Sequence, residues 1–203
     1  MDQKRALKQL RFLGTKPKEM RLAAESWKSD FQILISTILS ARTRDEVTIP
    51  VAENLFKKYP TTKKLANAKL KDVQKAIRPV NFYKNKSRNI INCAKKLQKD
   101  YNGKVPSKIE ELVKLNGVGR KTANVLLSQI GEDALAVDTH VSYISQKLNW
   151  TNSKNPEKIE EDLKKLFSKK HWSKVNSTLV RFGKTHTSKR EKDRLLNGII
   201  NTR

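Results

Sequence analysis

Lys121 and Asp138 are the residues whose type and position most suggest chemistry in this chain. Lys121 lies in LNGVGRKTANVLL (residues 115–127), after two glycines and at the start of an apolar-periodic run. A helix N-terminus, the neighbouring Arg120 and partial burial would each lower the pKa of a lysine from its ordinary value of ~10.4, which favours a nucleophilic amine. The alternative is a solvated lysine that binds a phosphate on the turn.

Asp138 follows seventeen residues later, within ALAVDTHV (residues 134–141). Aspartate is a preferred N-cap, so its simplest role is to begin a helix.

The glycines around Val118 predict a tight turn between two short helices. The first helix is expected to end at Leu115 or Asn116, and the second to begin at Arg120 or Lys121. A helix N-terminus presents backbone N–H groups that bind phosphates without reading sequence. The residues expected to contact a nucleic-acid backbone here are Gly117, Val118, Gly119 and Arg120.

Composition agrees with a polyanionic partner. Forty-four Lys and Arg oppose twenty Asp and Glu, which gives a formal charge of +24 and a pI near 10.2. Such a charge most often accompanies nucleic acid, although a lysine-rich surface without such a partner is the alternative. No apolar run has the length of a signal peptide or of a membrane span. We therefore expect a protein of the cytoplasm, associated with the nucleoid and not with a membrane.

The elements that must position these residues all follow helical periodicity. The stretch SDFQILISTILSAR (residues 29–42) places its apolar residues on one face, and Ser29 is a candidate N-cap. Asn155 followed by Pro156 predicts another helix start. Sustained alternation of the kind that strands show is absent, so the sequence predicts an all-α protein of eight to ten short helices.

On these residues the chain resembles the endonuclease III family of helix-hairpin-helix DNA glycosylases. The resemblance rests on LNGVGRKTANVLL and ALAVDTHV, and it extends through ILISTILSARTRDEV, NFYKNKSRNIINCAKKL, YNGKVP and LVRFGKT. It implies two helical domains, residues 22–131 and residues 1–21 with 132–203, and a helix-hairpin-helix at the cleft between them. It also implies a monomer that acts on duplex DNA containing damaged bases or abasic sites.

The resemblance implies a role for each candidate. Lys121 matches the lysine that forms a Schiff base with the sugar. Asp138 matches the aspartate that stabilises positive charge on that sugar and assists proton transfer, a role that is compatible with its being an N-cap. His140 is either structural or close to the sugar–phosphate. The activity implied is that of a bifunctional glycosylase and AP lyase that removes damaged, oxidised pyrimidines and cleaves the strand by β-elimination.

Two further segments match the loops that enter the minor groove in this family. In SARTRD, Arg42 and Arg44 replace the usual glutamine and threonine. In NFYKNK, Phe82 stands in the place of a leucine wedge, where it could stack on the orphaned base while Arg42 hydrogen-bonds to it. A core aromatic is the alternative for Phe82. The DNA contacts expected from these loops are Arg42, Arg44, Phe82, Lys84 and Lys86.

The C-terminal tail departs from the family. Most relatives end in four cysteines that hold a [4Fe–4S] cluster, whereas Cys93 is the single cysteine of this chain. Because such a cluster needs thiolates, we expect no cofactor and no metal. Thr187, Arg194, Asn197 and Arg203 stand where the ligands would be. Apolar residues of the tail are expected to pack in place of the cluster, while Lys189 and Arg190 contact the DNA backbone.

Two other functions remain open from the sequence alone. One is a monofunctional or mismatch-directed glycosylase, for uracil or thymine opposite guanine, but such enzymes usually lack a lysine at position 121. The other is a non-catalytic helix-hairpin-helix DNA-binding protein. That reading leaves Asp138 unexplained, because backbone binding does not require a carboxylate beside the phosphates.

Overall fold

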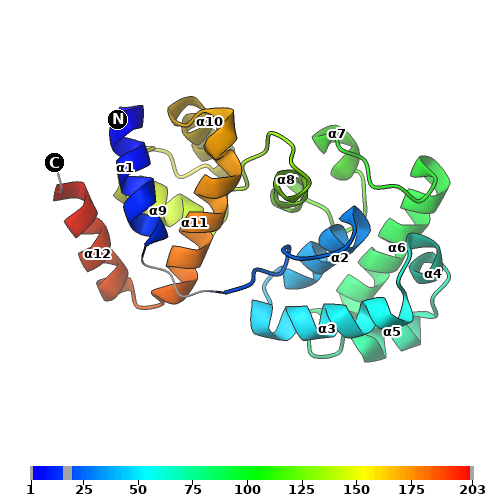
Figure 1. Cartoon of the computed structure of the whole chain (residues 1–203). Helices are drawn as coiled ribbons and strands as arrows, with labels where there is room; N and C mark the ends of the chain where they lie inside the picture. Colours follow the sequence, from blue (N-terminus) through cyan, green and yellow to red (C-terminus); the bar gives the residue numbers. More distant parts are fainter. Residues whose placement is uncertain (1, 16–19, 202–203) are drawn as a thin grey trace. The chain divides into compact units, whose positions relative to one another are not determined.

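The computed structural model describes residues 2–15 and 20–201, and all regular structure in these ranges is helical (Figure 1). This confirms the all-α prediction. The described ranges contain twelve α-helices and one 3-10 turn, more elements than the periodicity indicated. The chain divides into two compact units, Arg21–Glu132 and Met1–Met20 with Asp133–Arg203. None of the helices in the described part is long and apolar enough to cross a membrane.

The unit Arg21–Glu132 is built around one apolar helix, α2. Ser29 caps this helix as expected, since its Oγ accepts from the backbone N–H of Gln32 at 3.3 Å. Because α3, α6 and α8 all contact it, α2 is buried on several sides, and Leu34, Ile35 and Leu39 are inaccessible. The helices of this unit are α2 (Asp30–Ser40), α3 (Asp45–Lys58), α4 (Thr62–Ala66), α5 (Leu70–Ala76), α6 (Tyr83–Tyr101), α7 (Ile109–Leu112) and α8 (Arg120–Gln129).

The second unit joins the start of the chain to its end. Its elements are α1 (Gln3–Gly14), α9 (Thr139–Lys147), α10 (Pro156–Leu166), the 3-10 turn η1 (Lys169–His171), α11 (Trp172–Thr185) and α12 (Lys189–Asn201). Helix α11 contacts both α1 and α9, and α12 contacts the same two helices. Phe167 and Phe182 are among the largest fully buried side chains of this core.

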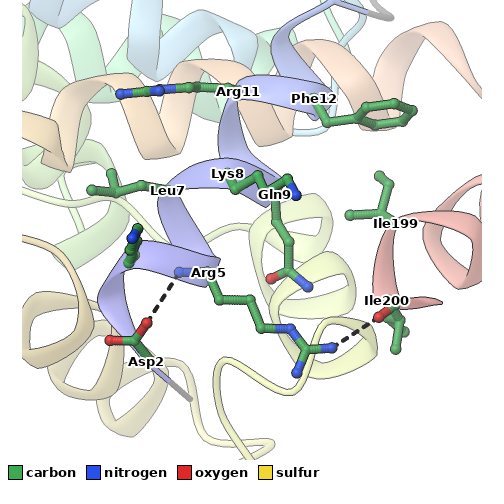
Figure 2. Close-up of a pocket in the computed structure, with 10 residues that line it drawn as sticks. Asp2, Arg5, Leu7, Lys8, Gln9, Arg11, Phe12, Ile199 and Ile200 are labelled. Atoms are coloured by element: carbon green, nitrogen blue, oxygen red, sulfur yellow. Dashed lines mark hydrogen bonds between the residues drawn. The ribbon is translucent and has the colours of Figure 1, made fainter. Parts of the chain in front are cut away.

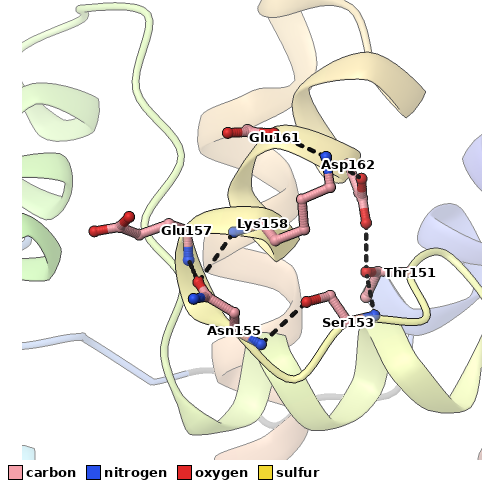
Figure 3. Close-up of polar contacts among 7 residues, drawn as sticks. All are labelled: Thr151, Ser153, Asn155, Glu157, Lys158, Glu161 and Asp162. Atoms are coloured by element: carbon pink, nitrogen blue, oxygen red, sulfur yellow. Dashed lines mark hydrogen bonds and ion pairs between the residues drawn. The ribbon is translucent and has the colours of Figure 1, made fainter.

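The loop before α10 is held by short-range polar contacts (Figure 3). The Oδ1 atom of Asn155 accepts from the backbone N–H of Glu157 at 2.8 Å and of Lys158 at 3.3 Å, which confirms Asn155 as the N-cap. In the second turn of the helix, the carboxylate of Asp162 accepts from the hydroxyl of Thr151 at 2.6 Å. These contacts replace packing in a segment that has few apolar residues.

Candidate active site and loops

The glycine hairpin joins α7 to α8 in the unit Arg21–Glu132. Helix α8 begins at Arg120, as predicted, but α7 ends at Leu112 rather than at Leu115. Leu115 and Val118 are buried, and the N–H of Val118 donates to the carbonyl of Leu115 at 3.1 Å. The prediction placed the helix end too late because residues 113–115 form hydrogen-bonded turns whose apolar residues continue the helical spacing.

The two glycines of the hairpin have different roles. Gly117 has φ +80°, and a Cβ there would lie 3.0 Å from the Cβ of Asn89 and 3.3 Å from the Cγ2 of Ile38. Gly119, the N-cap of α8, has an ordinary extended backbone at φ −97° and ψ 176°, and a Cβ there would meet no heavy atom within 4 Å. Gly117 is therefore required by the fold, whereas Gly119 leaves open space at the helix N-terminus, where a phosphate could approach closely.

Lys121 lies in the first turn of α8, next to Arg120, and both side chains are exposed. The prediction that Lys121 is partly buried is therefore wrong for the unit Arg21–Glu132. The opposite face of α8 is anchored, because Ala123 and Leu126 are inaccessible and α8 packs on α2. The lysine is thus an accessible amine at the start of a helix whose opposite face is buried.

Asp138 is the N-cap of α9, since its Oδ1 accepts from the N–H of Val141 at 2.8 Å. This confirms the capping role and leaves the side chain half-buried. His140 packs on the backbone of α11: a Cβ at Gly183 would lie 2.3 Å from the His140 Nδ1. That contact supports the structural role expected as one alternative for His140, and it explains a glycine inside α11.

The two expected minor-groove loops are adjacent. The guanidinium of Arg42 lies 4.8 Å from the ring centroid of Phe82, within the range of a cation–π contact. Phe82 is 53% exposed, which excludes the core alternative. Both residues have a left-handed backbone, with φ +57° for Arg42 and +59° for Phe82. The side chain of Asn81 joins the loops, because its amide nitrogen donates to the carbonyl of Arg42.

The prediction that Lys86 contacts DNA is wrong. Its side chain is buried, and its ammonium donates to the carbonyls of Leu39 and Ala41 and to the hydroxyl of Thr43. Burial lowers the pKa of Lys86 to about 8. An ammonium enclosed by protein oxygens cannot reach a phosphate from this position, so Lys86 supports the loop that carries Arg42.

Arg44 and Lys84 are exposed beside these loops, Arg44 at the start of α3 and Lys84 in the first turn of α6. Their positions are compatible with contacts to a phosphate. The residues that sequence reasoning missed are Asn81 and Thr43, which tie the two loops together through side-chain contacts. No short-range pattern signals them, because each bond joins positions about forty residues apart.

The tail contains none of the cysteines whose thiolates an iron–sulfur cluster requires. The only cysteine of the sequence, Cys93, is inaccessible inside α6 of the other unit, and burial raises its pKa to about 12. Thr187 precedes α12, Arg194 and Asn197 are exposed on it, and Arg203 lies outside the described residues. The described residues contain no group of three or more His, Cys, Asp or Glu side chains that could hold a metal ion. Lys189 and Arg190 are exposed at the start of α12.

The class of protein follows from comparison with known proteins. The family model described as "HhH-GPD superfamily base excision DNA repair protein" matches residues 35–169. The chain is also similar to Endonuclease III of Thermotoga maritima, with 46% identity over 76% of this chain and 73% of that protein. Endonuclease III of Bacillus subtilis is 36% identical over 89% of this chain and 84% of its own length.

Solved structures agree. A trapped covalent intermediate of endonuclease III with DNA matches with a TM-score of 0.83 and 32% identity, over 93% of this chain and 89% of that one. A thermostable thymine-DNA glycosylase matches with a TM-score of 0.81 at 18% identity, over 93% of this chain and 89% of that one, which shows the shared fold alone. The chain belongs to the HhH-GPD superfamily of base excision DNA repair proteins and, within it, to the endonuclease III family. It is accordingly a DNA glycosylase and AP lyase, not a non-catalytic DNA-binding protein.

Proposed function

We propose that the chain excises damaged, oxidised pyrimidines from duplex DNA, with Lys121 as the nucleophile. The observation that carries this proposal is an accessible lysine in the first turn of α8, directly after the hairpin. A similar protein at 32% identity has been captured as a covalent intermediate with DNA, and a covalent intermediate requires a nucleophile, a role that a lysine amine can fill.

The chemistry follows from the amine. The Nζ of Lys121 attacks C1′ of the sugar, and the bond from C1′ to the base breaks with its electron pair leaving on the base, which takes up a proton. Ring opening gives an iminium, which acidifies the hydrogen on C2′. Loss of that proton expels the 3′ phosphate oxygen, and water then hydrolyses the imine and releases Lys121. Asp138 stabilises the positive charge that develops on the sugar and assists the proton transfers.

The hairpin and the loops hold the DNA during this reaction. Backbone N–H groups at the N-terminus of α8 bind a phosphate, since the space beyond Gly119 is open. The damaged nucleotide must leave the stack, at a cost of a few kcal/mol. Phe82 fills the gap and Arg42 hydrogen-bonds to the orphaned base, as their exposed, adjacent side chains allow.

Borohydride trapping tests the nucleophile. The substrate is a duplex with one thymine glycol, and Lys121→Ala is compared with wild type. Lys63→Ala, which removes an exposed lysine of α4 in the same unit, is the control. A trapped band that Lys121→Ala loses and Lys63→Ala keeps supports the proposal. A trapped band that survives in Lys121→Ala would refute the assignment, and no trapping by wild type on any oxidised pyrimidine would refute the substrate class.

The chain is also proposed to act as a monomer on nucleoid DNA and without a bound metal. Its formal charge of +24 opposes self-association and favours a polyanion. Light scattering coupled to size exclusion tests the oligomeric state, and a dimer at micromolar concentration would contradict this part of the proposal.

A further inference from the structure

Helix α12 occupies the part of the sequence where most endonuclease III relatives have cluster cysteines, and it is held by side-chain contacts along its length. Leu196 and Ile199 form its apolar face and are 0% and 2% exposed. Helix α12 contacts α9 and α1. The tail that cannot bind a cluster therefore has an alternative attachment to its unit.

Polar contacts hold α12 at both ends. His186 precedes α12, and its Nδ1 lies 2.8 Å from the Oε1 of Glu191 in the first turn of the helix. The centroid of the His186 ring lies 4.7 Å from that of the Phe182 ring. At its last turn, the guanidinium of Arg5 in α1 donates to the carbonyl of Ile200 at 2.8 Å (Figure 2). A cation at a helix C-terminus satisfies one of the carbonyls that the helix leaves without an internal partner.

Asp193 makes the central polar contact. Its carboxylate accepts from the hydroxyl of Tyr143 and lies 3.2 Å from the ammonium of Lys147, and both partners belong to α9. The ring of Tyr143 is also flanked by cations, with the Nζ of Lys147 at 5.8 Å and that of Lys192 at 5.4 Å from its centroid. Asp193 thus joins α12 to two side chains of α9.

Three of the residues that α12 leaves exposed are cationic. Lys189, Arg190 and Arg194 are all exposed, whereas the acidic Glu191 and Asp193 are engaged by partners of their own unit. Both acids of α12 are therefore paired within their own unit, while three of its cations are exposed to solvent. This distribution suits the phosphate backbone of DNA, because unpaired acids on the same surface would repel it.

We propose that α12 is a metal-free replacement for the iron–sulfur cluster, and that Asp193 is the positioning residue that holds its three exposed cations for the DNA backbone. The inference rests on the proposed function only in that the chain binds DNA. It does not depend on the identity of the nucleophile or of the damaged base. Failure of the trapping experiment would therefore leave it standing.

The first experiment measures metal. Iron in the protein as purified from cells grown with ample iron is determined by mass spectrometry, and the visible absorption spectrum is recorded. The expected results are iron far below one atom per chain and no visible band. Stoichiometric iron would overturn the proposal, whatever the enzyme's activity.

The second experiment separates positioning from stability, and Asp162 provides a matched control. Asp162 of α10 accepts from the hydroxyl of Thr151 and lies 3.9 Å from the Nζ of Lys158 (Figure 3). It therefore makes the same kind of contact as Asp193. The two aspartate side chains are 28% and 27% exposed. Asp162→Ala and Asp193→Ala should therefore lower the melting temperature to a similar degree.

DNA binding should distinguish the two variants. Binding of an undamaged duplex is measured against salt, well below either melting temperature. Asp193→Ala is expected to raise Kd about 3- to 10-fold. It should also make the slope of log K against log salt less steep by ~0.9 or more, which corresponds to the loss of at least one phosphate contact. Asp162→Ala should leave both values unchanged, and Asp193→Glu should restore most of the affinity. The single-turnover cleavage rate at saturating DNA should stay within about threefold of wild type in Asp193→Ala, because the cations bind the backbone and do not touch the reacting atoms.

Two results would overturn the role of Asp193. If Asp193→Ala lowers the melting temperature but leaves Kd and the salt slope of wild type, the contact is structural only. If replacing Lys189, Arg190 and Arg194 together by alanine leaves the salt slope unchanged, α12 does not meet the DNA backbone. We expect the salt slope of that triple variant to fall by the equivalent of up to about three phosphate contacts.

Discussion

The hairpin at Gly117 and the loops at Arg42 and Phe82 both use left-handed backbone, but with opposite residue types. At Gly117, φ is +80° and Asn89 and Ile38 occupy the space that a side chain would need. At Arg42 and Phe82 φ is also positive, at +57° and +59°, yet both residues carry large exposed side chains. The difference indicates that the hairpin presents backbone atoms, whereas the loops present side chains.

The loops must therefore offset a strain that the hairpin avoids. A non-glycine residue in the left-handed region costs about 1–2 kcal/mol. Side-chain contacts provide the support, since Lys86 donates to the carbonyls of Leu39 and Ala41 and Asn81 donates to that of Arg42. Strained, exposed residues that the surrounding structure holds in place are typical of functional sites.

The largest effect that would test this comparison is on the rate of strand cleavage. Lys121→Ala should lower the single-turnover rate of strand cleavage by about 10³-fold or more, equivalent to ~4 kcal/mol, because it removes the nucleophile. Arg120→Ala, the adjacent exposed cation, should instead weaken binding by severalfold and leave the rate at saturating DNA within an order of magnitude. Similar losses of rate in both variants would mean that the hairpin provides only charge.

The hairpin glycines should respond differently to alanine. Gly117→Ala should lower the free energy of unfolding by about 2–4 kcal/mol, because it adds both a left-handed strain and close contacts with Asn89 and Ile38. Gly119→Ala should change stability by less than about 0.5 kcal/mol but weaken duplex binding, since its Cβ would occupy the open space before α8. Urea denaturation and a binding titration on both variants measure this. Equal stability losses would contradict the distinction.

Local patterns in the sequence were sufficient for the hairpin but not for the loops. Gly117, the start of α8 at Arg120 and the caps Ser29, Asp138 and Asn155 depend on residues a few positions apart, so they could be predicted. The early end of α7 could not, because turns there keep the apolar spacing of a helix.

Lys86 shows most clearly what local sequence patterns could not predict. A lysine in a basic segment was expected to contact DNA, yet its acceptors lie at positions 39–43, more than forty residues away. The burial of a charged side chain depends on tertiary packing that no local pattern records. The resemblance to a family placed Arg42 and Phe82 in two loops. It did not indicate that these two side chains contact each other.

The support that Lys86 gives the loops should depend on pH. Lys86→Met should lower the free energy of unfolding by about 1–3 kcal/mol at pH 7, because it leaves polar oxygens without a donor. Burial lowers the pKa of folded Lys86 to about 8 from 10.5, so the unfolded chain binds more protons between these two values and the wild-type stability rises with pH across this window. Urea denaturation should therefore show the advantage of wild type over Lys86→Met growing from pH 7 to pH 10. Parallel pH curves would mean that the ammonium is not desolvated.

The smallest expected change in stability comes from Phe82→Gly. This variant tests most directly why the loops carry large side chains, and not glycine, at positions with a left-handed backbone. Phe82→Gly removes the strain of φ +59° and should leave stability unchanged or raise it by up to about 1 kcal/mol, the reverse of Gly117→Ala. Excision of the damaged base should nevertheless slow, because the wedge is lost. A double-mutant cycle with Arg42→Ala and Phe82→Ala should give a coupling of about 0.5–1 kcal/mol in stability, as an exposed cation–π pair predicts. If Phe82→Gly destabilises the protein while excision keeps the wild-type rate, Phe82 is a structural residue and the loops present no wedge.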